Sequence, residues 1–145
     1  MSKYFSTVIF VFALQLCLGC SSQRAEQREA LYAEIGGHEG LESLVDAFVQ
    51  RIVKDKVILP YFAKSSVKHF KQGFINHLCG LVNGPCEYNG DSMIDIHTGM
   101  NINEGDFNRV VELLIQAMED VGIPYSSQNR ILAKLAVFRA EIIKI

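Results

Sequence analysis

The apolar residues of this chain recur at the spacing of α-helices over four long stretches, and this periodicity restricts the fold more than any other feature. The four stretches are residues 39–54, 65–82, 103–121 and 126–142. In the first of them, Leu41, Leu44 and Phe48 fall on one helical face. No stretch shows the sustained alternation of apolar and polar residues that is typical of strands. The sequence therefore predicts an all-α domain.

Breaking and capping residues separate the predicted helices. They are Pro60, Asn83-Gly84-Pro85, Asn103 as a cap, Gly122 with Pro124, and Ser126 or Ser127 as the first residue of the last helix. Residues 86–100 show poor periodicity and carry the breaking residues Gly90 and Gly99, so they predict a long ordered loop. We expect two helical pairs, one on each side of this loop. Long loops in compact domains are commonly functional.

The N-terminal residues have the character of a targeting segment. Lys3 precedes an apolar run over residues 8–18, which is too short to span a bilayer comfortably and is typical of a signal peptide. A small residue, Gly19, stands directly before Cys20, as in the cleavage box of a bacterial lipoprotein. Cys17 stands where that box usually has leucine. Plain secretion and an uncleaved membrane anchor are the two alternatives.

This pattern predicts export to the cell envelope, with the protein periplasmic or anchored in the membrane through a lipid on Cys20. The expected organisation is a lipoprotein-like signal peptide at residues 1–20, a polar tether at 21–30 and one folded domain at 31–145. The net charge is −2, and no run of Lys or Arg is long enough to follow a phosphate backbone. We therefore expect no nucleic-acid partner.

Two cysteines remain in the predicted folded domain. In an oxidising compartment Cys79 and Cys86 can form a disulfide, and two separate thiols are the equal alternative. Together with His77 they offer three zinc ligands, but their spacing matches no common structural zinc pattern. The motifs of zinc proteases, serine hydrolases, phosphate loops and dinucleotide-binding folds are missing from the sequence.

The four histidines do not identify a site by themselves. They are His38, His69, His77 and His97. A single histidine among apolar residues is more often structural than a metal ligand. In the same way, the aromatic residues at helical spacing are ordinary core candidates, namely Phe48, Phe62, Phe70 and Phe74.

The order of several short segments is more specific than any one of them. The chain carries, in this order, Tyr32 with Gly36-Gly37, Pro60-Tyr61-Phe62, Gly84-Pro85, Tyr88-Asn89-Gly90, Met93 with His97, Gly99 and Ile102, then Phe107 and Gly122-Ile123-Pro124. This ordered set resembles a bacterial-like globin, a truncated haemoglobin, over residues 31–143. Because the chain has no Trp, it is similar to the first group of that family rather than to the second or third.

The resemblance implies a truncated globin fold, a two-over-two helical sandwich around haem b. It implies that His97 is the proximal ligand of the iron, that Phe62 stacks on the ring, and that Met93, Ile102 and Val110 line the slot. Haem needs an imidazole ligand and a flat apolar slot, and an acceptor near His97 would fix the tautomer of its ring. Ser65, His69 and Lys71 lie where the family often places partners of the haem propionates.

The side of the haem on which a gas would bind, here called the ligand side, departs from the family pattern. Val49 stands where the first group commonly has a tyrosine that donates a hydrogen bond to oxygen. Phe70 and Phe74 stand at positions that often carry a polar residue. Without these donors oxygen is retained weakly, whereas carbon monoxide and nitric oxide depend on them less. His69 and His77 lie off the face expected for a sixth iron ligand.

We therefore expect a haem globin that binds diatomic gases (O2, NO or CO) at a five-coordinate iron in an apolar pocket. Of the family's roles in oxygen binding and oxygen transport, this pocket favours oxygen transport least. A haem redox enzyme such as a nitric oxide dioxygenase, served by a reductase, is the first alternative. The second is a helical interaction lipoprotein without haem.

Overall fold

The computed structural model describes residues 31–144, and all regular elements of these residues are helical. The elements are α2 (Gly37–Lys54), η1 (Leu59–Phe62), α3 (Val67–Leu81), α4 (Met93–His97), α5 (Glu104–Asp120), α6 (Tyr125–Leu135) and η2 (Ala136–Glu141). The predicted all-α class is confirmed. The predictions for the signal peptide, the tether and Cys20 fall outside the described residues. No helix within residues 31–144 has the length and apolar character needed to cross a membrane.

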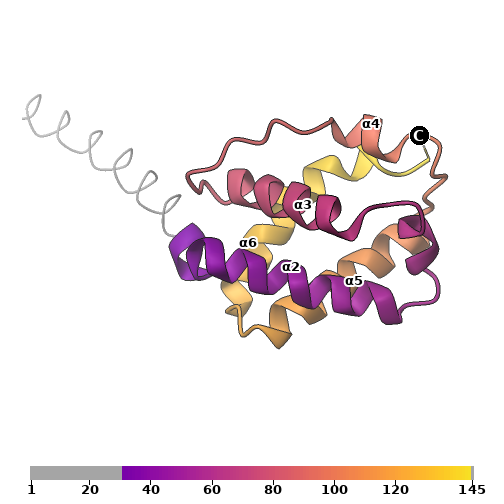
Figure 1. Ribbon diagram of the computed structural model, residues 1–145. Helices are drawn as coiled ribbons and strands as arrows, with labels where there is room; N and C mark the ends of the chain where they lie inside the picture. The colour runs from indigo at the N-terminus through magenta and orange to yellow at the C-terminus, as the bar shows by residue number, and fades with distance from the viewer. Residues whose placement is uncertain (1–30, 145) are drawn as a thin grey trace, which may run out of the picture.

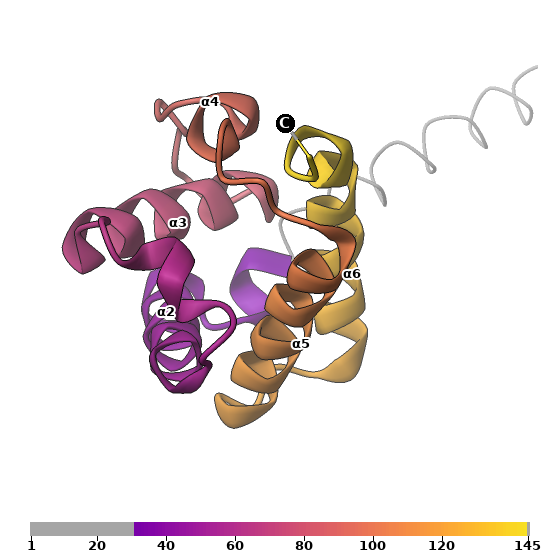
Figure 2. The same cartoon turned by 90° about the vertical axis from the view of Figure 1, so that its right-hand side faces the viewer.

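The long helices form two layers. Figure 2 shows α2 and α3 on one side and α5 and α6 on the other, with α4 beside η2 at the edge of the molecule. Helix α2 packs against both α3 and α5, which makes it the central element of the domain. In Figure 1 the described chain starts at one end of α2, and the connection to α3 lies at the other end.

The core forms because each amphipathic helix turns its apolar stripe toward the opposite layer. From α2 the buried side chains include Leu41, Leu44 and Phe48, all at helical spacing. From α5 they include Leu114 and Met118. Burial of a side chain of this size stabilises the fold by about 1.5–3 kcal/mol.

Asp55 organises the connection between α2 and α3. Its carboxylate accepts hydrogen bonds from the backbone N–H groups of Val57 (3.0 Å) and Ile58 (2.9 Å). It also accepts one from Nε of Arg109 on α5, at 2.7 Å. The hydrogen bond from Ile58 and the Arg109 guanidinium hold the pKa of Asp55 below its usual value. These bonds attach the connection, and with it η1, to the second layer.

Two details of the helix pattern differ from the prediction. Residues 86–100 are not all loop, because Met93–His97 form the short helix α4, capped by the Ser92 hydroxyl that accepts from Asp95 N–H. The last helix begins at Tyr125 and not at Ser126 or Ser127. Ser127 therefore lies inside the first turn and not at its cap, and its buried hydroxyl donates to Glu34 at 2.9 Å.

A disulfide joins Cys79 of α3 to Cys86 in the segment that leads to α4. This resolves the two alternatives that the sequence left open. Helix α3 ends at Leu81, and Asn83 shortly after it has a positive φ of 60°, beyond which Gly84 N–H donates to the Cys79 carbonyl at 2.8 Å. The disulfide therefore anchors the start of the segment that carries the site histidine.

Reducing this disulfide should destabilise the domain without unfolding it. The crosslink closes a loop with a sequence separation of 7, for which chain entropy gives about 2–3 kcal/mol. Urea unfolding followed by circular dichroism, with and without dithiothreitol, measures the difference. The double variant Cys79→Ala/Cys86→Ala is the control, because its midpoint should not respond to reductant. Equal midpoints for the wild type in both conditions would contradict the crosslink.

Candidate functional site

His97 lies in α4 with one ring nitrogen already engaged. Its Nδ1 is 2.7 Å from the backbone oxygen of Met93, one helical turn earlier. A carbonyl oxygen only accepts, so Nδ1 carries the proton and Nε2 keeps its lone pair in the neutral ring. The side chain is half-buried. This tautomer is the one that a metal ligand needs, with a backbone acceptor fixing the orientation of the ring.

Three of the predicted site residues form one aromatic cluster. The rings of Phe62 and Phe70 meet edge to face with centroids 4.9 Å apart. The rings of Phe70 and Phe74 are stacked at 5.6 Å, and Phe48 lies 5.5 Å from Phe74. Phe62, Phe70 and Phe74 are only half-buried, so they present apolar ring surface in addition to the contacts that they make with each other.

The other predicted residues are distributed over the surrounding elements. Val49 on α2, Met93 on α4 and Val110 on α5 are half-buried, and Ile102 between α4 and α5 is buried. The described contacts join the phenylalanines to one another and His97 to Met93. They do not join the histidine to the aromatic cluster.

Of the predicted propionate partners, Ser65 and His69 are exposed, and Lys71 forms an ion pair with Asp46. The cap of α3 is the neighbouring Ser66, whose hydroxyl accepts from His69 N–H. His69 thus lies away from the interior, as the sequence predicts.

The burial of His77 is the feature that sequence reasoning missed, because the sequence placed this residue off the face expected for an iron ligand. His77 is buried, and its Nε2 has no hydrogen-bond partner among residues 31–144. Its ring packs edge-on against Tyr88 (4.9 Å) and Phe138 (5.2 Å). Burial lowers the pKa of His77, so the ring is neutral at pH 7. Helical spacing from Phe70 and Phe74 is the signal that could have placed it on the inner face of α3.

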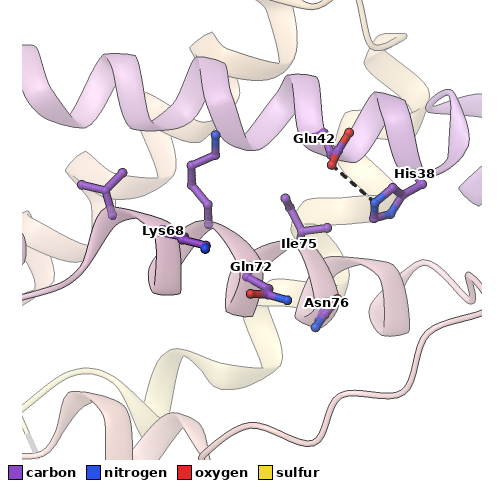
Figure 3. Close-up of a pocket in the computed structure, with 8 residues that line it drawn as sticks. His38, Glu42, Lys68, Gln72, Ile75 and Asn76 are labelled. Atoms are coloured by element: carbon purple, nitrogen blue, oxygen red, sulfur yellow. Dashed lines mark ion pairs between the residues drawn. The ribbon is translucent and has the colours of Figure 1, made fainter.

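A groove of about 520 Å³ separates the outer surfaces of α2 and α3 (Figure 3). His38, Glu42, Lys68 and Asn76 are among its lining residues, and His38 pairs with Glu42 at 3.5 Å. Of the residues predicted to contact haem, it is lined only by Lys71, a predicted propionate partner. No group of three metal-ligating side chains occurs in the part of the chain that the structure describes, and the disulfide removes both thiols of the zinc alternative.

Comparison with known proteins identifies the fold and the family. The sequence model of the bacterial-like globin family matches residues 30–144. The chain belongs to this family. A group 1 truncated hemoglobin from Mycolicibacterium paratuberculosis is 29% identical over 119 residues, which cover 82% of this chain and 88% of that protein. A group 1 truncated hemoglobin from a Nostoc species is 26% identical, with 78% of this chain and 96% of that protein covered.

Solved structures confirm the truncated globin architecture. The truncated hemoglobin of Tetrahymena pyriformis superposes with a TM-score of 0.76 at 22% identity, covering 79% of this chain and 98% of that one. The 2/2 hemoglobin of a Synechococcus species gives a TM-score of 0.73 at 16% identity. The two helical layers of this globin are therefore the predicted two-over-two sandwich.

The residues present fit the haem that the family implies. A haem site requires an imidazole nitrogen with a free lone pair and apolar faces for the ring. Nε2 of His97 meets the first requirement because Nδ1 is bound to Met93. The half-buried rings of Phe62, Phe70 and Phe74 meet the second.

Proposed function

We propose that this globin binds haem b and uses it to bind diatomic gases, with His97 as the proximal ligand. The observation that carries the proposal is the 2.7 Å contact between Nδ1 of His97 and the Met93 oxygen. It fixes the tautomer in which Nε2 can bind iron, in the position that corresponds to the family's proximal segment. When bound, the haem supplies an iron with one position open to a gas.

The remaining site residues act by packing and orientation. Phe62 offers a ring face for stacking, and Ile102 and Val110 provide apolar wall on the side of α5. Met93 has two roles: its carbonyl orients His97, and its half-buried side chain adds to the slot. An apolar surrounding of this kind limits the access of solvent to the iron, which tunes its redox potential.

The ligand side determines which gases are retained. Val49, Phe70 and Phe74 carry no hydrogen-bond donor, so a ligand that gains partial negative charge finds no stabilising partner at these positions. We infer weak retention of oxygen and comparatively undisturbed binding of nitric oxide and carbon monoxide. This favours a sensor, scavenger or ligand store over an oxygen carrier.

Titration with haemin tests the proposal. We expect a Soret band that saturates at one haem per chain, because the domain has one histidine oriented as described for His97. The ferrous form should then bind carbon monoxide reversibly. If purified protein supplied with haemin develops no Soret band beyond that of free haemin, the proposed function is wrong.

We further propose export and a lipid anchor on Cys20, from the apolar run at 8–18 and the cleavage box that follows it. Cells fed a palmitate analogue should label the wild-type protein and leave Cys20→Ala unlabelled. Cys17→Ala should label like the wild type and is the matched control. Label that persists in Cys20→Ala would contradict the anchor, with no consequence for haem binding.

A further inference from the structure

Exposed apolar side chains gather where α2 connects to α3. They are Val53 (52% exposed), Val57 (57%), Leu59 (40%) and Val67 (57%). Single exposed apolar residues are common on protein surfaces, whereas several together mark interaction sites. Successive hydrogen-bonded turns keep this connection compact, for example those from Leu59 N–H to the Asp55 oxygen and from Tyr61 N–H to the Ile58 oxygen. We refer to residues 53–68 as the corner surface.

Lysines alternate with these apolar residues. Lys54, Lys56, Lys64 and Lys68 are all exposed. The one acidic residue of the corner surface, Asp55, is buried and paired with Arg109, and the next acidic residue in the sequence is Glu87. Four lysines against one aspartate give residues 53–68 a formal charge of +3, whereas the whole chain carries −2. Two carboxylates of α5 lie nearby: Asp106 accepts from the Tyr61 hydroxyl, and Asp120, which pairs with Arg51, also interacts with Lys54.

We propose that the corner surface docks this globin on an anionic lipid bilayer. Valine and leucine side chains at the tip of a compact turn can enter the headgroup region, which removes their apolar surface from water. Lysines around them can lay their methylene chains along the bilayer and hold their ammonium groups at anionic headgroups. An acidic protein could meet the lysines equally well, but it would leave four apolar side chains unexplained unless it also offered an apolar groove.

The chain outside the described structure allows this orientation. The described chain starts at the end of α2 opposite the corner surface (Figure 1). Helix α2 has 18 residues and is therefore about 27 Å long. Residues 21–30 span at most about 35 Å. The tether can therefore be longer than α2, so a lipid on Cys20 and the corner surface at the end of α2 can contact one membrane. This argument about reach rests on the proposed anchor, whereas docking itself requires no lipid on the protein.

Vesicle sedimentation tests docking without the anchor. The protein lacking residues 1–20 is used, because it keeps the whole stretch that the family model matches, residues 30–144. It should sediment with phosphatidylglycerol vesicles and not with phosphatidylcholine vesicles, and sodium chloride should weaken the binding. Replacing Lys54 and Lys56 by Gln should lower affinity about 25-fold, at about fivefold for each charge.

Val57→Glu and Val137→Glu separate docking from general surface effects. Val57 belongs to the corner surface, whereas Val137 is equally apolar and 68% exposed on η2. Val57→Glu should lower vesicle affinity at least about tenfold, and Val137→Glu should bind like the wild type. Failure of the wild type to bind phosphatidylglycerol vesicles, or equal loss in both variants, would overturn docking. The Soret band of the same samples reports haem binding independently.

Discussion

Replacing His97 by glycine should lower haem affinity by about 100-fold or more. Removal of a partner that only orients a metal ligand already costs about 10–100-fold in metal affinity, and His97 is proposed to be the ligand itself. The apolar contacts of Phe62 and Phe70 would remain, so residual weak binding is expected. Competition for haem with an apoglobin of known affinity, followed by the Soret band, measures the loss.

His38→Gly is the matched control for this prediction. His38 is an exposed histidine on α2 that pairs with Glu42, and its removal should leave haem affinity unchanged. Free imidazole, which fits the space of the deleted ring, should restore the wild-type spectrum to His97→Gly and should have no such effect on His38→Gly. Wild-type affinity in His97→Gly would show that another residue binds the iron.

Restoring donors on the ligand side should slow oxygen release by about 10- to 100-fold. Val49→Tyr and Phe74→Gln each introduce a donor at a position where the first group of this family often has one. A hydrogen bond to a partly charged partner contributes about 1.5–3 kcal/mol, which corresponds to this range of rates. Stopped-flow displacement of oxygen by carbon monoxide measures the change, and autoxidation should slow in parallel.

Val53→Tyr is the control for these variants, because Val53 lies on the same helix as Val49 and is 52% exposed. Its oxygen release should match the wild type. Carbon monoxide dissociation should change little in any of the variants. If the wild type already releases oxygen slowly, and His77→Leu releases it fast, then Nε2 of His77 is a donor and the ligand side is not apolar.

Local sequence signals predicted most of the helical architecture. The apolar stripe of α5 could be recognised from its helical spacing. Its cap could be recognised as well, because Asn103 and Asp106 form a capping box with each other within one turn. Helix α3 likewise follows from its stripe and from the breaking residues after it. These features depend on residues close in sequence, so a single chain suffices to recognise them.

The features that were missed depend on tertiary contacts. The two serines suggested a cap for α6, but the helix already begins at Tyr125, and the Ser127 hydroxyl donates instead to Glu34, far away in the sequence. Helix α4 was overlooked because five residues give too little periodicity to recognise. The choice between thiols and a disulfide required the distance between Cys79 and Cys86, whose Cα atoms lie 5.7 Å apart in the fold.

The candidate site also combines features that the sequence could predict with features that depend on the folded structure. Composition and spacing alone could not distinguish His97 from three other histidines, and only the order of the surrounding segments selected it. The hydrogen bond between its Nδ1 and the Met93 oxygen follows from the short helix α4, which the sequence did not predict. The burial of His77 against Tyr88 and Phe138 depends on three segments that meet only in the folded chain.

Resonance Raman spectroscopy of the ferrous, gas-free protein reconstituted with haem tests the central claim most directly. A neutral histidine on five-coordinate iron produces an iron–histidine stretching band. We expect this band in the wild type, its loss in His97→Gly, and its return when imidazole is added. A wild-type spectrum without the band, or one with the band unchanged in His97→Gly, would contradict the assignment of His97 as the proximal ligand.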